Sequence, residues 1–428
     1  MSNLSGTIFR DMVATDSADP VSVAEYEKTG GFEALKKAVK MTGEDIIAEV
    51  KKAKLIGRRG EAHSFGNRLE HILNIPETPK YIACNASEDE PGTFTDRFLL
   101  GRLPLKLVEG IAIAGFALKA KASYVYVRGE YRKLQKQLIK AIENARNAGF
   151  LGKNILGTGF DFDIHVNSGA GAYVCGEDTA VLNSIEGKVG RPRIKQPPHL
   201  EGGGVFLKPA LINNVESFVQ IPTIIGMGGD EFLKTGHPDS GGTKLVCLSG
   251  HVRNRGLFEV PLGGLTLREI IYDDELGGGI AGGKDMKFFH LGGQSGPIGG
   301  SDLLDTVYSY TDLKKAGLSV GSGAVVVMDE TVSVIDYVKC VVEFFANESC
   351  GKCVPCREGT RHILDILDRL SILGAAGSDD LETLRRLIRT MTVAAFCGLG
   401  TMAVSALNSA WRHFKAEFEA NVQVGEKT

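Results

Sequence analysis

The residues best suited to chemistry in this sequence are four cysteines near its C-terminal end. Cys350, Cys353 and Cys356 form a C-x2-C-x2-C run, and Cys397 follows farther along the chain. Residues 1–10 lack the basic-then-apolar pattern of a secretory signal. In a chain without such a signal, this spacing favours metal ligation over disulfide bonds.

Two kinds of metal site compete for these cysteines. Three close thiolates and a distant fourth are typical of a four-iron cluster, because each iron of the cuboid needs one thiolate. Structural zinc is the alternative, although four-cysteine zinc sites more often use two separated C-x2-C pairs. Gly351 and Pro355 should bend the loop around the metal, and the N-terminus of the following helix would favour a negatively charged cluster. We therefore expect a [4Fe-4S] cluster.

The other cysteines are scattered singly, and we expect small buried side chains at Cys84, Cys175, Cys247 and Cys340. The 54 glycines gather in short clusters, which usually mark tight turns or close backbone approach to a ligand.

With 428 residues and 43% hydrophobic residues, the chain can form two to four folded domains. A formal net charge of −3 gives no general attraction to nucleic acid or anionic lipid. The longest apolar stretch, around Gly110–Leu118, is too short to span a membrane, so we expect no membrane insertion and a cytoplasmic or peripheral protein.

The first half of the chain alternates helical and strand-like segments. Two short helices are expected within residues 32–54, longer helices at Leu105–Lys119 and Lys133–Ala148, and strands at Tyr81–Asn85 and Ser123–Val127. Such alternation predicts a parallel α/β sheet. Glycines and carboxylates cluster where the strands end, and open sheets of this kind bind ligands outside the carboxyl ends of their strands.

The second half of the chain has a different pattern. A small α+β module is expected, with a short helix at Leu267–Ile271 and strands at Lys244–Ser249, Gly256–Val260, Phe288–Leu291 and Ala324–Met328. Four helical segments, which suit a small bundle, follow at Tyr337–Asn347, Thr360–Leu373, Leu381–Met391 and Val404–Phe418. The clustered cysteines lie within or beside these helices.

Four ordered motifs give the sequence a family resemblance over nearly its whole length. ESCGKCVPCREGT at Glu348–Thr360 resembles the ESCGxCxPCREGT motif of the flavoprotein subunit of respiratory complex I, NAD-reducing hydrogenases and NAD-dependent formate dehydrogenases. CNASEDEPGTFTDR at Cys84–Arg97, GAYVCGEDTAVLNSIEG at Gly171–Gly187 and INNVES at Ile212–Ser217 are similar to further motifs of that family.

The resemblance implies a fold of three parts. These are an α/β FMN- and nucleotide-binding domain at residues 1–235, a ubiquitin-like (β-grasp) α+β domain at 236–330, and a four-helix bundle carrying the iron–sulfur cluster at 331–428. It also implies FMN and NADH as cofactors beside the cluster. The implied partners are other iron–sulfur subunits of a multisubunit oxidoreductase, including a small 2Fe-2S thioredoxin-like subunit, through which the chain would sit peripherally at the inner membrane.

Carried over by motif, the resemblance assigns one catalytic candidate and a set of cofactor contacts. Glu90 matches a carboxylate that lies near the nicotinamide in the family. The cofactor-binding candidates are Gly57, Gly60, Arg68, Asn85, Ser87, Glu88, Asp89, Tyr173, Gly176, Glu177, Asp178, Lys195, Asn213 and Asn214. Glycines let the backbone reach the flavin, and amides can bond to its ring or phosphate.

The glycine-rich loop departs from the family pattern GRGGAGFPTGLKW. Arg59 and Ala62 replace glycines, His63 replaces a phenylalanine that stacks on the nucleotide, Arg68 replaces a lysine, and Ser87 replaces an aspartate. Pro198 likewise replaces an aromatic partner of Lys195, whereas Phe65, displaced by two positions, could restore one stacking surface. These changes bear directly on nucleotide binding.

Three functions are therefore in competition. The first is an enzyme in which NADH reduces FMN and electrons pass to the cluster. The second is a non-catalytic subunit that keeps the cluster as an electron wire or docking module but has lost nucleotide or flavin binding. The third is an NADPH-linked variant in which Arg59 or Arg68 offers charge to a 2′-phosphate. For either arginine, a solvated surface charge is the simpler interpretation.

Overall fold

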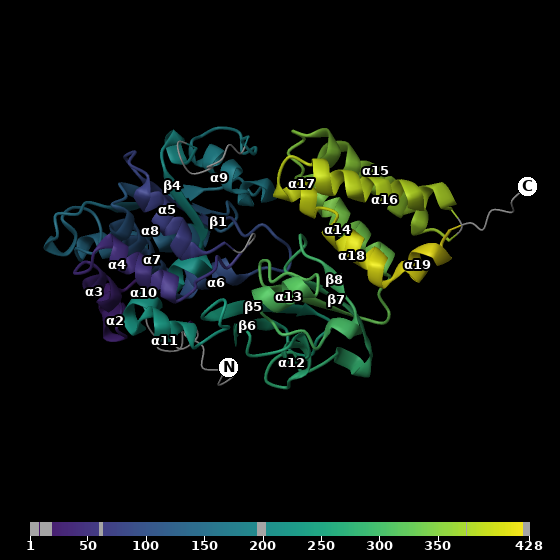
Figure 1. Ribbon diagram of the computed structural model, residues 1–428, viewed down its shortest axis with the longest axis horizontal. Coiled ribbons are helices and arrows are strands. Elements are labelled where there is room, and N and C mark those ends of the chain that lie inside the picture. Colours follow the sequence, from purple (N-terminus) through teal and green to yellow (C-terminus); the bar gives the residue numbers. More distant parts are fainter. Residues whose placement is uncertain (1–7, 9–18, 60–62, 195–202, 374, 423–428) are drawn as a thin grey trace, which may run out of the picture. The chain divides into compact units, whose positions relative to one another are not determined.

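The computed structural model describes residues 8, 19–59, 63–194, 203–373 and 375–422 (Figure 1). The chain divides into two compact units. Unit 1 comprises residues 1–89, 94–246 and 257–265, and unit 2 comprises residues 90–93, 247–256 and 266–428. The short segment Glu90–Thr93 therefore belongs to unit 2, although the residues on both sides of it belong to unit 1.

Unit 1 is built on a four-stranded sheet. Its strands are β1 (Tyr81–Ala86), β2 (Ala122–Val127), β3 (Asp163–Ser168) and β4 (Ala210–Asn214), in the spatial order β3-β2-β1-β4. β1 pairs in parallel with β2 and β4, and β2 with β3. The predicted parallel α/β sheet is confirmed.

Helices surround this sheet. They are α2 (Val23–Lys28), α3 (Glu33–Ala38), α4 (Gly43–Lys52), α5 (Phe65–Asn74), α6 (Thr95–Arg102), α7 (Pro104–Leu118), α8 (Arg132–Asn147), α9 (Asp178–Ile185), α10 (Val215–Met227) and α11 (Gly229–Leu233). α7 is buried along almost its whole length because it is mostly apolar, with Lys106 and Glu109 as its charged residues, and Pro104 occupies its first turn. A side chain at Gly110 would collide with the carbonyl oxygen of Phe218, so glycine allows α7 and α10 to pack closely.

The strand order creates a switch point between β1 and β4. From β1 the chain moves outward to β2 and β3, and then returns past β1 to form β4 on the other side. Crossover connections between parallel strands are right-handed, so connections that run in opposite directions along the sheet cross opposite faces of it. This opens a crevice at the carboxyl ends of the two inner strands. The sequence predicted ligand residues at strand ends, and the topology identifies β1 and β4 as the relevant pair.

A second sheet has the order β6-β5-β9-β7-β8. Its strands are β5 (Thr243–Gly250), β6 (Gly256–Pro261), β7 (Met286–Leu291), β8 (Ile298–Gly299) and β9 (Ala324–Asp329), with the short helices α12 (Leu267–Tyr272) and α13 (Tyr310–Lys315) between them. β5 pairs in parallel with β9, and β7 is antiparallel to both β8 and β9. The sheet is therefore mixed, as expected for an α+β module.

Unit 2 ends in helices α14 (Val334–Glu348), α15 (Val354–Leu370), α16 (Ser378–Ala394), α17 (Gly398–Met402), α18 (Ser405–His413) and α19 (Lys415–Ala420), of which α15 and α16 run side by side (Figure 1). The predicted helical C-terminal region is confirmed, but two details differ. α15 begins six residues before Thr360, and the predicted helix at Val404–Phe418 is broken at Phe414, which has a non-helical backbone. Within the described part of the chain, every helix is too short or too polar to cross a membrane.

Candidate flavin and iron–sulfur sites

Polar side chains meet at the switch point of unit 1. In the parallel register, Cys84 lies beside Asn213 and Asn85 beside Asn214. The Asn85 amide donates to the carbonyl of Gly176 at 3.0 Å, which ties the end of β1 to the segment before α9. Ser87 donates its hydroxyl to the Asn85 side-chain oxygen at 2.9 Å. The structure thus brings predicted cofactor residues from three motifs together.

The asparagines of β4 serve two roles. Asn214 caps α10, because its side-chain oxygen accepts from the Ser217 amide at 3.0 Å. Asn213 is buried and faces the glycine-rich loop. A Cβ added at Gly57 would lie 3.6 Å from the Asn213 side-chain oxygen, and one at Gly176 would lie 3.6 Å from the Ser87 hydroxyl. Bare backbone opposite amide and hydroxyl groups suits a flat polar ligand such as FMN.

The segment before α9 carries the remaining predicted contacts. Tyr173 and Gly176 are partly exposed and belong to a 3₁₀ turn. Glu177 caps α9 by accepting from the amides of Thr179 and Ala180, each at 2.9 Å. Asp178 approaches Arg68, with 3.8 Å between oxygen and nitrogen. Arg68 also donates to the Ile212 carbonyl at 3.1 Å, so its charge is directed to neighbouring protein groups.

Glu88 is fully buried, and its carboxylate binds protein groups. It accepts from the amide of Arg97 at 2.9 Å and from that of Asp96, and so caps α6. Tyr131 donates its hydroxyl to the same carboxylate at 3.1 Å. The backbone of Glu88 has a φ of +40°, a strained value for a residue with a side chain, and Arg128 donates to its carbonyl at 3.0 Å. The loop is held in this conformation from both sides.

Arg59 is directed inward. Its guanidinium lies 3.0 Å from Glu88 and 2.9 Å from Asp96, and it donates to the Thr95 hydroxyl at 2.9 Å. Its side chain is only 18% exposed, so the expectation of a solvated surface charge was wrong. Burial raises the pKa of Asp96 to about 8, although Arg59 opposes this rise. Burial therefore favours the protonated form of Asp96, and the Arg59 guanidinium contacts the side chains of both Asp96 and Glu88.

Asp89 adds a second ion pair beside this one. Its side chain lies 3.1 Å from the Arg128 guanidinium, which also contacts Glu130. The Glu130 carboxylate is the main reason that the pKa of Arg128 is raised. Two charged side chains, Arg59 and Asp89, thus reinforce the loop Ser87–Asp89.

Among the described residues, His63 and Phe65 are the two considered for stacking on the nucleotide. His63 is exposed. Phe65 is fully buried and packs edge-on against Phe218 at 5.5 Å, so the suggestion that it restores a stacking surface was wrong. Four predicted or discussed positions lie outside the described residues: Gly60, Ala62, Lys195 and Pro198.

Glu90 differs from the candidate flavin- and nucleotide-binding residues because it belongs to unit 2. Its carboxylate accepts from the amide of Ser295 at 3.0 Å and from its hydroxyl at 2.6 Å. Sequence reasoning missed Ser295, because this residue lies far along the chain from all four motifs. The only available signal was the GGQSG run from Gly292 to Gly296, whose glycines predict an unusual loop.

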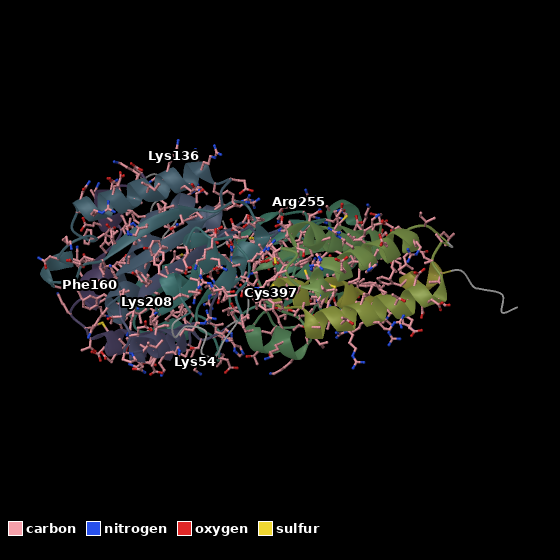
Figure 2. All side chains as sticks on the ribbon, turned by 90° about the horizontal axis from the view of Figure 1, so that it is seen from above. Lys54, Lys136, Phe160, Lys208, Arg255 and Cys397 are labelled. Carbon is pink, nitrogen blue, oxygen red and sulfur yellow. The ribbon has the colours of Figure 1, made fainter. Side chains whose placement is uncertain are left out.

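The four predicted metal ligands lie in the helical part of unit 2; Cys397 is labelled in Figure 2. Gly351 has a φ of +72°, so it makes the turn that the sequence predicted. Cys353 precedes α15, whereas Cys356 lies inside its first turn, where Pro355 is also accommodated. The prediction that Pro355 bends a loop before the helix was therefore wrong, since both Pro355 and Cys356 lie within α15. Cys397 immediately precedes α17.

The thiols are close enough to interact electrostatically. Burial, together with the charges of Cys353, Cys397 and Cys350, raises the pKa of the Cys356 thiol to about 11, and the Ser349 hydroxyl opposes this at 3.3 Å. The Phe396 amide donates to the Cys353 sulfur at 3.5 Å. Among the described residues, no three His, Cys, Asp or Glu side chains form a group that could hold a single metal ion. Four cysteines, two of which have hydrogen-bonded sulfurs, match the donor chemistry of an iron–sulfur cluster.

The remaining cysteines mostly follow expectation. Cys84, Cys175 and Cys247 are buried, as predicted. Cys340 is exposed, so the prediction of a buried side chain was wrong at this position. It lies on α14, and its exposure makes it a useful control for the cluster cysteines.

A parallel α/β unit with a polar switch point, joined to helices that carry four cysteines, defines a class of proteins that combine a nucleotide-like cofactor with an iron–sulfur centre. Residues 50–223 match the Nuo51 FMN-binding domain, and residues 336–421 match the NADH-ubiquinone oxidoreductase-F iron-sulfur binding region.

Known proteins resemble the chain over most of its length. It is 40% identical to the F 2 subunit of the NADH-quinone oxidoreductase of Rhizobium meliloti, over 95% of this chain and 96% of that protein. It is 41% identical to the HndC subunit of the NADP-reducing hydrogenase of Solidesulfovibrio fructosivorans, over 94% and 81%. A crystal structure of NAD+-reducing [NiFe]-hydrogenase in the H2-reduced state superposes with a TM-score of 0.82 and 32% identity, covering 91% of this chain and 64% of that one. The chain belongs to the family of FMN- and [4Fe-4S]-binding F subunits of NADH-quinone oxidoreductases and their hydrogenase relatives.

Proposed function

We propose that this chain oxidises NADH and delivers the electrons to a [4Fe-4S] cluster as one subunit of a multisubunit oxidoreductase. The observation that carries the proposal is that one chain holds both matched regions, with a polar switch point in the first and four cysteines in the second. FMN, when bound, supplies the conversion between a two-electron hydride donor and one-electron acceptors. These matches favour this function over a non-catalytic electron wire.

The residues proposed for each role follow from the motifs and their surroundings. Glu90 is the proposed catalytic residue, and Cys350, Cys353, Cys356 and Cys397 are the proposed cluster ligands. FMN and nucleotide would be held by Gly57, Gly60, Arg68, Asn85, Ser87, Glu88, Asp89, Tyr173, Gly176, Glu177, Asp178, Lys195, Asn213 and Asn214. Glu88 and Glu177 would act by shaping backbone, since their carboxylates cap helices α6 and α9.

We also propose domains at residues 1–235, 236–330 and 331–428. The four-stranded parallel sheet supports a flavin domain, and the mixed sheet with two short helices supports a ubiquitin-like middle domain. The proposed partners are further iron–sulfur subunits, among them a small 2Fe-2S thioredoxin-like subunit. Through them the chain would be peripheral to the inner membrane.

The decisive test uses the protein purified without oxygen. We expect a flavin absorption band, FMN in an acid extract, about four irons and four acid-labile sulfides per chain, and bleaching of the flavin by NADH. Protein that contains the cluster but no FMN would overturn the proposal and restore the electron-wire alternative. Stoichiometric zinc without sulfide would overturn the cluster assignment.

His63 should limit the affinity for NADH. An aromatic stacking pair contributes about 0.5–1.5 kcal/mol, and this chain has an imidazole where the family has a phenyl ring. We expect His63→Phe to bind NADH about twofold to tenfold more tightly, with FMN content unchanged. Titration of the flavin-loaded protein under anaerobic conditions measures this. Equal affinity in both proteins would show that the missing ring does not limit binding.

The surface around the cysteines should be covered by a partner. Val354, Val393, Phe396 and Met402 are large apolar side chains, exposed by 60%, 76%, 38% and 39%. Electron transfer requires proximity, so we expect Val393→Asp to weaken association with the neighbouring iron–sulfur subunit at least tenfold while iron content stays unchanged. Ile372→Asp is the matched control, since Ile372 is 64% exposed but lies beyond the other end of α15. Equal effects of the two substitutions in co-purification would contradict the proposed surface.

A further inference from the structure

The segment Glu90–Thr93 is anchored on the second sheet. Thr93 donates its hydroxyl to that of Ser322 at 2.6 Å, and Ser322 donates to the Gly292 carbonyl at 3.2 Å. Gly92 has a φ of +85°, and a Cβ there would lie 3.3 Å from the Val326 side chain. The EPGT part of the CNASEDEPGTFTDR motif is therefore fixed by groups of unit 2.

The loop between β7 and β8 is shaped around the Glu90 carboxylate. Ser295 donates both its amide, at 3.0 Å, and its hydroxyl, at 2.6 Å, to the same Glu90 oxygen. Gly293 has a φ of +90°, and any side chain at this position would collide with that carboxylate. Both observations indicate that the loop conformation and the position of the carboxylate depend on each other.

Hydrogen bonds to a carboxylate are stronger than neutral ones, and the hydroxyl bond here is short. A reacting carboxylate is effective only when its orientation is fixed, because small displacements cost rate. Glu90 is only partly buried, so packing alone does not hold it. Ser295 adds a directional constraint through its two hydrogen bonds.

We propose that Ser295 is a positioning residue, which orients Glu90 for the reaction with nicotinamide nucleotide. This inference rests on the proposed function, because it assumes that Glu90 acts on the nucleotide. Ser295 itself need not touch the substrate. Its role would be exerted entirely through the Glu90 oxygen that it binds.

A double-mutant cycle tests the inference in the full chain loaded with FMN and cluster. We expect Ser295→Ala to lower kcat/KM for NADH with ferricyanide about tenfold. FMN content, the iron–sulfur spectrum and the rate at which dithionite-reduced protein reduces ferricyanide should not change. In a Glu90→Gln background, Ser295→Ala should have less than a twofold effect, because its partner is already altered. Ser301→Ala is the control, since Ser301 is exposed and lies just beyond β8, the strand that follows the loop.

Two outcomes would overturn the inference: kcat/KM within twofold of the native value in Ser295→Ala, or the same loss in both backgrounds. If Ser295→Ala does not retain its cofactors, Gly293→Ala replaces it, and its added methyl group should reproduce the Glu90→Gln kinetics. Failure of the proposed function has a different signature, because NADH would then leave the flavin of the native protein unreduced.

Discussion

Cys397→Ala should abolish stable cluster binding. Removal of the fourth thiolate leaves one iron of the cuboid without a protein ligand. The iron content should therefore fall from about four per chain to well below that after gel filtration. Electron transfer from NADH to the partner subunit should be lost with it. Flavin bleaching by NADH should persist, because the proposed FMN residues belong to unit 1. Iron and sulfide analysis and electron paramagnetic resonance of the reduced protein measure these effects.

The matched control for this substitution is Cys340→Ala. Cys340 is an exposed thiol on the neighbouring helix α14, and it is not among the proposed ligands. We expect this variant to retain its full iron content and spectrum. Full iron content in Cys397→Ala would show that the fourth ligand lies elsewhere.

The sequence predicted the main elements of the fold because their patterns are locally strong. α7 is a mostly apolar helix with proline in its first turn, and β2 is rich in β-branched and aromatic residues. Each can be recognised without knowledge of its neighbours. The strand order could not be predicted in this way, since it depends on where β4 inserts after a long excursion of the chain.

The candidate site, like the fold, could be predicted from the sequence only in part. The cysteine spacing and the four motifs identified residues that the structure does place together, such as Asn85 and Gly176. Contacts between single residues far apart in the sequence could not be predicted. Ser295 meets Glu90 across 205 positions. Arg59, which the sequence left as a surface charge, turns inward and contacts the buried side chains of Glu88 and Asp96.

Arg59 should be essential for the stability of the loop that carries Glu88. Arg59→Met leaves the buried Glu88 carboxylate without its cation, and breaking a buried pair typically costs about 3–5 kcal/mol. We expect amide hydrogen exchange in α6, corrected for intrinsic rates, to accelerate more than a hundredfold. Arg132→Met, which changes an exposed arginine on α8, should have little effect.

The cost of Arg59→Met should also increase with pH. In the native chain the folded-state pKa of Asp96, raised to about 8 by burial, exceeds the unfolded value of about 3.9. Its contribution to stability is therefore fully present below about pH 4 and is lost as pH rises through about 8. Without the Arg59 cation this pKa rises further, so the variant keeps losing stability above pH 8 where the native protein levels off. Exchange rates in α6 at pH 7 and pH 9 should show a larger difference between the two proteins at pH 9. In an Asp96→Asn background that pH dependence should vanish, and its persistence would assign the effect to another group.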